Sequence, residues 1–350
     1  MVRRFAIERL ELAALESATH RLSIGVDCGG GHVAELPTVA VVGGSPGPTL
    51  MAVAGVHGDE YEGMEAIRRV AAATEPVQLA GRFLGIVVAN PFAFRARTRA
   101  TPLEVDGLNL ARVFPGDSAG QPTERLAAAL LALIRRTLTE DDLLIDFHSG
   151  SADVAFAPLI GVRDVPGPAR QVAADAARRF GLPRLWLIPD GQGPLNAETA
   201  RLGIPTLGTE TTGRAGCEDA DVEEFRRGVG NMFLHMRMLA GESPVPVDAA
   251  FRPTVDVIAT AEGFLRTTIR VGDVVEASQG LGTIVSELGD EVVEVVAPVG
   301  GEVWAARSMP AVRAGELCFM VAIGIAPGQQ IDAAASRGCR SSPGSHHRRG

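Results

Sequence analysis

The stretch TLMAVAGVHGDEYEG, Thr49 to Gly63, joins a short apolar run to a histidine and several acidic residues. Residues 49–56 are apolar without alternation, which is typical of a strand buried on both faces of a mostly parallel sheet. His57 and Glu60 come directly after this run, three residues apart. Two such residues are too few to hold a metal ion alone, so further ligands must come from elsewhere in the chain.

Strand-like and helix-like segments alternate through the first two-thirds of the sequence. Further apolar runs occupy residues 83–90, 142–147 and 204–210, and helical spacing of apolar residues marks 62–73, 122–138, 169–181 and 221–239. Thr123 is a predicted helix start and Gly181 a predicted helix stop. This order predicts an α/β fold, a mostly parallel mixed sheet flanked by helices.

The composition of the chain changes at the Pro-rich stretch 240–253, a predicted linker. Short β-type segments follow, in which RVGDVV and RAGELC look like two copies of one element. They predict a smaller C-terminal β-barrel or sandwich domain. The predicted division is an irregular or β N-terminal segment, a central domain, the C-terminal β domain and a disordered tail, at 1–45, 46–240, 250–325 and 326–350.

Composition excludes several classes of function. A net charge of −9 over 350 residues argues against nucleic acid as a partner. The absence of a long apolar run argues against a membrane span, and the mixed N-terminus argues against a signal peptide, so we expect a cytoplasmic protein. The four cysteines form no C-x-x-C pair, and all 33 basic residues are arginine. A structural zinc site is therefore not expected, and a Walker P-loop or Schiff-base lysine is excluded.

The polar residues that follow the apolar runs should meet at one edge of the sheet. Functional groups of open α/β sheets gather beyond the carboxyl ends of the strands. His57 and Glu60 follow the first run, arginines of segment 90–99 follow the second, His148 ends the third and Glu210 ends the fourth. Two histidines and one carboxylate form a catalytic zinc set that leaves a fourth position for water.

Some neighbours of these residues have two interpretations. Asp59 competes with Glu60 as a ligand, and Glu60 is preferred because a glutamate three residues after a histidine can fold back onto the same metal. Asp146 either orients His148 or is an unrelated buried acid. Arg95 and Arg97 either add positive potential at the mouth of the site or are solvated surface residues.

A set of motifs in this order resembles the succinylglutamate desuccinylase/aspartoacylase family of zinc deacylases, within the zinc carboxypeptidase-like fold group. The motifs are GVHGDEYEG (55–63), NPFAF (90–94), DGLNLARVFPG (106–116), DFHSG (146–150) and GTETTG (208–213). The resemblance covers roughly residues 40–240 and continues into the C-terminal β domain. It extends to a bacterial branch that includes N-acetyl-diaminobutyrate deacetylases.

The resemblance implies a role for each matched residue. His57, Glu60 and His148 match the zinc ligands, with one zinc ion per chain. Glu210 matches the general base, and Arg99 matches the arginine that polarises the scissile carbonyl.

The segment around Arg112 matches the substrate-binding part of the family. Arg112 itself matches the arginine that docks the substrate carboxylate, and Asn109 is a further predicted substrate-binding residue. Ala111 and Ser149 stand where family members have asparagine, so these positions bear on specificity.

The implied function is zinc-dependent hydrolysis of the amide bond of a small anionic N-acyl amino acid. N-acetyl-diaminobutyrate, N-acetyl-aspartate and N-succinyl-glutamate represent the substrate types. A zinc carboxypeptidase acting on peptides is the first alternative, and a non-catalytic binding protein is the second. The C-terminal segment resembles biotinyl and lipoyl carriers, but their lysine is missing from the expected tip at 287–291. The C-terminal β domain is therefore expected to act as a scaffold, to gate the substrate or to mediate oligomerisation. In the last case the protein would be a homo-oligomer.

Overall fold

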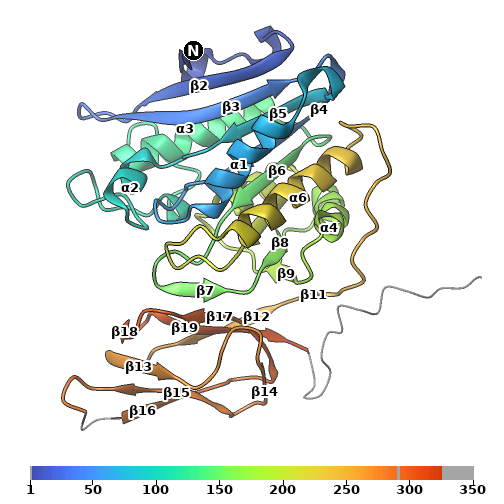
Figure 1. The fold of residues 1–350 in the computed structure, drawn as a ribbon. Helices are drawn as coiled ribbons and strands as arrows, with labels where there is room; N and C mark the ends of the chain where they lie inside the picture. The colour runs from blue at the N-terminus through green and yellow to red at the C-terminus, as the bar shows by residue number, and fades with distance from the viewer. Residues whose placement is uncertain (1, 290–291, 325–350) are drawn as a thin grey trace, which may run out of the picture.

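The computed structural model describes residues 2–289 and 292–324, so the predicted tail at 326–350 lies outside the described residues (Figure 1). Its main feature is a ten-stranded sheet. In spatial order the strands are β1 (Val2–Ala6), β2 (Ala18–Asp27), β3 (Val33–Val42), β5 (Ala80–Ile86), β4 (Ser45–Val53), β6 (Leu143–Phe147), β10 (Thr206–Glu210), β8 (Leu159–Arg163), β9 (Leu185–Ile188) and β11 (Phe251–Arg252). Most neighbours run parallel, and only β2–β3, β3–β5 and β10–β8 are antiparallel pairs among them. The predicted mostly parallel mixed sheet is confirmed.

Helices cover both faces of this sheet, as predicted (Figure 1). They are α1 (Glu62–Ala73), α2 (Pro91–Ala96), α3 (Pro122–Thr137), α4 (Pro168–Phe180), α5 (Leu195–Arg201) and α6 (Asp219–His235). Apolar residues of α3 and α5 pack on one face of the sheet, and those of α1, α4 and α6 pack on the other.

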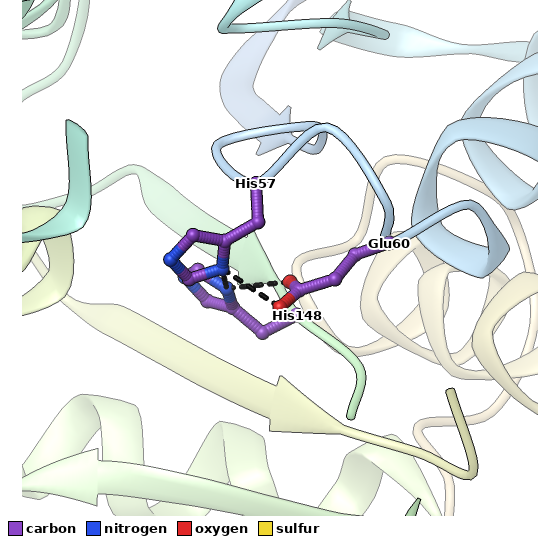
Figure 2. Close-up of side chains that lie close together, drawn as sticks. All are labelled: His57, Glu60 and His148. Atoms are coloured by element: carbon purple, nitrogen blue, oxygen red, sulfur yellow. Dashed lines mark hydrogen bonds and ion pairs between the residues drawn. The ribbon is translucent and has the colours of Figure 1, made fainter. Parts of the chain in front are cut away.

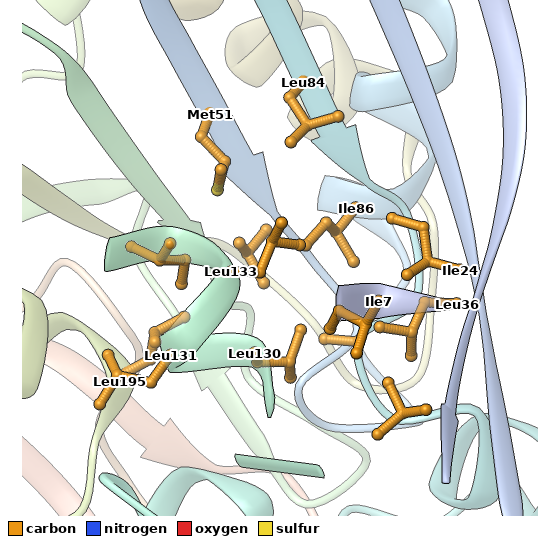
Figure 3. Close-up of a cluster of buried hydrophobic side chains, with 14 of the residues drawn as sticks. Ile7, Ile24, Leu36, Met51, Leu84, Ile86, Leu130, Leu131, Leu133 and Leu195 are labelled. Carbon is orange, nitrogen blue, oxygen red and sulfur yellow. The ribbon is translucent and has the colours of Figure 1, made fainter. Parts of the chain in front are cut away.

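The two apolar clusters explain why the central strands show no alternation. In the first cluster, Met51 of β4 and Leu84 of β5 pack with Leu130 of α3 (Figure 3). The neighbours of Met51 on β4, Leu50 and Ala52, belong to the second cluster on the opposite face. Both faces of the strand are therefore buried, which requires apolar residues at every position.

Two predicted helix ends can be compared with the structure. Helix α3 begins at Pro122, and the backbone nitrogen of Gln121 donates a 2.8 Å hydrogen bond to Glu124 Oε2. The predicted start at Thr123 is wrong because its hydroxyl is buried and donates to Asp106 Oδ1 instead of capping the helix. Gly181 does end α4, with a φ of 104° that favours glycine.

The N-terminal segment is more regular than predicted. Strands β2 and β3 are ten residues long, pair along their whole length and extend the main sheet. Buried residues alternate with more exposed ones over most of their length, because α3 covers one face, and only the end of β3 near Val41 is also packed against α1 on the other face. The expectation of irregular strands at 1–45 is therefore corrected.

The C-terminal β region (residues 254–323) contains two antiparallel sheets, in agreement with the predicted barrel or sandwich. One has the order β12 (Thr254–Ile258), β19 (Leu317–Ile323), β17 (Gly301–Arg307) and β14 (Val274–Val275); the other has the order β16 (Val292–Val296), β15 (Gly280–Val285), β13 (Gly263–Thr267) and β18 (Ala311–Val312). Of the predicted tip at 287–291, residues 287–289 are described; they follow β15, and Leu288 among them is exposed. In the part of the chain that is described, no helix is both long and apolar enough to cross a membrane.

A strand from the middle of the chain completes the first C-terminal sheet. Strand β7 (Val154–Phe156) follows closely after His148 in the sequence, yet it pairs with β17, where Ala306 lies opposite Ala155. In Figure 1 it lies between the main sheet and the C-terminal β region. The two parts therefore share a strand as well as a linker.

A buried glutamate also joins the two parts. Glu302 of β17 accepts hydrogen bonds from Arg184, which precedes β9, at 2.8 and 2.9 Å. Arg252 of β11 donates to it at 3.2 Å and Trp304 at 2.8 Å. Trp186 of β9 lies in the same apolar cluster as Trp304, so the two tryptophans of the chain both lie at this contact.

Candidate metal centre and active site

The loop between β4 and α1 carries the first two candidate ligands. A Cβ on Gly58 would lie 2.1 Å from the carbonyl carbon of Ala93, so only glycine allows this loop to pack directly on α2. The Gly58 nitrogen also donates to the carbonyl of Thr98 at 3.0 Å. These contacts fix the loop that carries His57 and Glu60, whose side chains are almost completely buried.

The third candidate ligand comes from the neighbouring strand. Strands β4 and β6 are parallel partners, so their carboxyl ends bring His148 to the loop that follows β4. Figure 2 shows the three side chains pointing toward one another. His57 Nδ1 lies 2.7 Å from Glu60 Oε1, His148 Nδ1 lies 2.8 Å from Glu60 Oε2, and the two Nδ1 atoms are 3.2 Å apart.

The group His57, Glu60 and His148 could hold a metal ion. Its donor atoms lie closer together than the roughly 3.4 Å between two ligands that are about 2.1 Å from one tetrahedral zinc ion, so the side chains would have to separate slightly to hold the ion. Two imidazoles and a carboxylate also match the donor types of catalytic zinc sites. Asp59 is not part of this group, and its Oδ2 accepts a hydrogen bond from the backbone nitrogen of Ala152.

Burial and mutual interactions shift the pKa values of the three candidate ligands. Burial lowers the pKa of His57 to about 4, so this ring is neutral near pH 7. Burial also opposes ionisation of Glu60, but His57 and His148 outweigh it and hold the pKa of Glu60 well below its usual range. Burial opposes protonation of His148, yet Asp146 and Glu60 together raise its pKa well above the usual value.

Asp146 has the geometry of a residue that orients His148. It is fully buried on β6, and its Oδ1 lies 3.4 Å from His148 Nε2. The other ring nitrogen, Nδ1, lies 2.8 Å from Glu60 Oε2. This favours the first of the two interpretations given above for Asp146.

Glu210 ends β10, the parallel neighbour of β6, and therefore lies at the same edge of the sheet. Its Oε2 is buried without a hydrogen-bond partner among the described residues. Burial, and after it the negative charge of Glu60, raises the pKa of Glu210 well above its usual range. A carboxyl group with a raised pKa is suited to taking up and releasing a proton near neutral pH.

Arg99 lies against the candidate ligands. Its Nη1 donates to Glu60 Oε1 at 2.8 Å and also to the hydroxyl of Ser151. The side chain of Arg99 is 41% exposed, so the guanidinium is open to solvent on one side while Glu60 holds the other.

Arg112 lies near the site, in the short 3₁₀ helix Leu110–Arg112. Burial and the positive charge of Arg99 lower its pKa, while Glu210 and Glu60 raise it. Its Nη1 donates to the carbonyl of Ala111 at 2.9 Å. Asn109 caps the same helix through its Oδ1, so a contact between Asn109 and substrate stays a prediction.

Arg95 and Arg97 are exposed residues at the end of α2, and Arg97 is the C-cap in the left-handed conformation, with a φ of 59°. That position favours the interpretation of Arg97 as a structural surface residue.

Sequence reasoning missed Ser151 altogether, and it named Ser149 only as a position that bears on specificity, without its partner. The hydroxyl of Ser149 donates to Glu62 Oε2 at 2.7 Å, and the hydroxyl of Ser151 donates to Glu60 Oε1 at 2.8 Å. Both side chains are buried. The only sequence signal was a pair of small polar residues at the carboxyl end of a strand, which does not reveal their partners.

Comparisons with known proteins identify the family of the chain. Residues 46–236 match the family model described as the succinylglutamate desuccinylase/aspartoacylase catalytic domain. The chain is 28% identical over 295 residues to a Halomonas elongata protein named N-alpha-acetyl-L-2,4-diaminobutyric acid deacetylase, covering 81% of this chain and 84% of that protein.

Solved structures show the same fold. A succinylglutamate desuccinylase/aspartoacylase from Rhodobacter sphaeroides has a TM-score of 0.79 at 26% identity, and the match covers 89% of this chain and 98% of that one. The product-bound ectoine utilization protein EutE from Ruegeria pomeroyi has a TM-score of 0.80 at 23% identity, with 90% and 98% covered. The second likeness concerns the fold alone.

Proposed function

Because the chain belongs to the succinylglutamate desuccinylase/aspartoacylase family, we propose that this deacylase is zinc-dependent and hydrolyses the amide bond of a small N-acyl amino acid. One observation carries the proposal: His57, Glu60 and His148 form a group that could hold a metal ion, at the sheet edge where Glu210 ends its strand. The name of the Halomonas elongata relative makes N-acetyl-diaminobutyrate the first substrate to test.

In this proposal His57, Glu60 and His148 hold the ion. Zinc bound by three protein ligands supplies Lewis-acid chemistry, which lowers the pKa of water from about 15.7 to about 7. Glu210 accepts the proton of the attacking water and then donates it to the leaving amine, a task that suits its raised pKa.

The two arginines have different tasks in the proposal. Arg99, held by Glu60, donates to the oxygen of the scissile carbonyl as negative charge develops there. Arg112 binds the substrate carboxylate through two parallel hydrogen bonds, which the planar guanidinium allows and an ammonium group does not.

The test compares substrates and metal contents. Protein stripped by a chelator and reloaded with zinc is assayed with N-acetyl-diaminobutyrate, N-acetyl-aspartate, N-succinyl-glutamate and dipeptides. We expect hydrolysis of an N-acyl amino acid, loss of activity without metal, recovery with zinc, and about one zinc ion per chain. Hydrolysis of dipeptides alone would favour the carboxypeptidase, and activity that survives complete removal of metal would exclude zinc dependence.

A matched pair of histidine variants identifies the ligands. His148→Ala should lose both the bound zinc and the activity while the fold persists, because one of three ligands is removed. His20→Ala is the control, because His20 lies on β2 and its ring contacts the backbone carbonyl of Glu16. Full zinc occupancy in His148→Ala would show that another residue is the ligand.

A further inference from the structure

Ser151 lies between the candidate metal ligands and the candidate catalytic arginine. It is 1% exposed, and its hydroxyl donates to Glu60 Oε1 at 2.8 Å while accepting a hydrogen bond from Arg99 Nη1. Arg99 Nη1 also donates to the same Glu60 oxygen at 2.8 Å. The three polar groups therefore form a closed triangle in which each side chain contacts the other two.

The backbone holds Ser151 in this place from two sides. Its carbonyl accepts a hydrogen bond from the nitrogen of Ala215 at 2.9 Å, which links it to the loop that follows Glu210. The next residue, Ala152, donates to Asp59 Oδ2 at 3.0 Å, which links the turn to the loop that carries Glu60.

Ser151 also adopts a backbone conformation that serine rarely takes. Its φ is +29°, in the region that favours glycine. Such a conformation is retained only where surrounding contacts determine it. A hydroxyl group is the feature that serine offers here and glycine does not.

This hydroxyl affects both of its partners. A hydroxyl group can donate one hydrogen bond and accept others, so it satisfies a carboxylate and a guanidinium at once. The Ser151 hydroxyl donates a hydrogen bond to Glu60 Oε1, while His148 contacts the other carboxylate oxygen, Oε2. The Ser151 hydroxyl also accepts a hydrogen bond from Arg99 Nη1. The other two nitrogens of this guanidinium, Nη2 and Nε, make no hydrogen bond within the described residues, which leaves them for substrate.

We infer that Ser151 is a positioning residue that fixes Glu60 for metal binding and Arg99 for substrate polarisation in one arrangement. The inference rests on the proposed function for its effect on turnover. Its effect on the metal does not depend on which substrate is hydrolysed. Residues that support metal ligands commonly contribute 10–100-fold to metal affinity or activity.

The test uses Ser151→Ala with Ser278→Ala as a matched control. Ser278 is an exposed serine of the C-terminal β region, also at positive φ, +66°, so its change removes the same atom from the same kind of backbone. Zinc affinity is measured by competition with a chelator, and kcat and KM are measured separately. We expect Ser151→Ala to bind zinc about 10-fold more weakly and to lower kcat by about 10–100-fold with little change in KM. Ser278→Ala should match the wild type.

Two further variants separate the hydroxyl from other effects. Ser151→Gly relieves the positive φ, so it should fold even if Ser151→Ala does not, and it should show the same losses. In an Arg99→Ala background, Ser151→Ala should lower kcat much less than it does in the wild type, because the residue it positions is gone.

Several results would overturn the inference. One is a Ser151→Ala variant that keeps the zinc affinity and the kcat of the wild type, or that changes KM alone. Another is a Ser151→Gly variant in which both zinc affinity and kcat are restored. A third is an effect of Ser151→Ala on kcat that is as large in the Arg99→Ala background as in the wild type. If the protein hydrolyses no N-acyl amino acid, the proposed function fails, but zinc affinity still decides whether Ser151 positions Glu60.

Discussion

Replacement of Glu210 and replacement of Arg112 should change different kinetic constants, because only Glu210 acts in the proton transfers. Glu210→Gln should lower kcat by about 10²-fold or more and leave zinc content and KM nearly unchanged. Arg112→Ala should chiefly raise KM, because the substrate carboxylate is present in both the ground state and the transition state. Steady-state kinetics with zinc-loaded protein measure both effects.

The contact made by Arg112 has its own control. Arg112→Lys should recover little, because one ammonium group does not reproduce two parallel hydrogen bonds. A substrate whose carboxylate is replaced by an amide should be poor for the wild type and no worse for the Arg112 variants. If Arg112→Ala still prefers carboxylate to amide as strongly as the wild type does, Arg112 is not the anchor.

Metal binding should depend on pH through His148. In metal-free protein its raised pKa keeps the ring protonated near pH 7, whereas His57, with a pKa of about 4, is already neutral. A ligand must lose its proton to bind metal, so zinc affinity should rise about tenfold per pH unit until the pKa of His148 is passed. Asp146→Asn removes a group that raises this pKa and should flatten the dependence. Calorimetry in buffers of different ionisation enthalpy counts the protons released, and release of none in the wild type at pH 7 would contradict the prediction.

The meeting of His57, Glu60, His148 and Glu210 was predictable because each follows an apolar run, and parallel strands deliver their carboxyl ends to one edge. The contacts of Ser151 were not predictable. They join three loops whose relative positions depend on tertiary packing, and a serine in a turn carries no sign of its partners. The capping role of Asn109 was also missed. The motif around Asn109 was interpreted as a substrate-binding segment, and its hydrogen bond to the backbone of Ala111 was not considered.

Helix α6 contains a matched pair of glycines that differ only in their surroundings. A Cβ on Gly228 would lie 2.1 Å from the ring of Phe180, which is fully buried, whereas a Cβ on Gly230 would meet nothing within 4 Å. Gly228→Ala should therefore destabilise the protein by about 1–3 kcal/mol through overpacking. Gly230→Ala should stabilise it by about 0.5–1 kcal/mol, because alanine loses less backbone entropy in a helix. Denaturant titration of both variants measures the difference, and equal effects would contradict the prediction.

Elements buried on both faces were the easiest to predict. Strands β4, β5, β6 and β10 each contain only small or apolar residues over most of their length, and the observed strands overlap all four predicted runs. Strands β2 and β3 were predicted only as irregular strands, because charged residues such as Arg21 and Glu35 interrupt their apolar pattern. The predicted helix at 221–239 ends at His235 instead, and Arg237 then takes a φ of +58°.

At the scale of the whole molecule, Glu302 should contribute strongly to the contact between the main sheet and the C-terminal β region. Its removal leaves Arg184 and Arg252 partly buried without their carboxylate. Breaking a buried pair in this way costs about 3–5 kcal/mol, so we expect Glu302→Ala to destabilise the protein by about 3 kcal/mol. Glu294→Ala, at an exposed position of β16, is the control and should change stability by less than about 0.5 kcal/mol.

Tryptophan fluorescence is a direct measure of this contact, because Trp186 and Trp304 both lie in it. In Glu302→Ala the emission should shift toward that of solvated indole at a lower denaturant concentration than in the wild type. An unchanged midpoint would show that β-strand pairing and apolar packing hold the two parts together without Glu302.

The separate C-terminal β region was predictable from the Pro-rich stretch and the close-set glycines, but its dependence on β7 was not. A three-residue strand has too short a pattern to be assigned, and its partner β17 lies about 150 residues further along the chain. Pairing over such a separation is set by the tertiary fold.

The shared strand limits how this chain can recombine with its relatives. A crossover within the Pro-rich stretch 240–253 would transfer β17 from one parent and leave β7 from the other. The chimaera would then have a foreign strand pair a few residues from His148. A gene exchange that keeps this strand pair intact must carry residues 154–156 together with the C-terminal β region. The C-terminal β region is then inherited with the turn beside the candidate metal ligands.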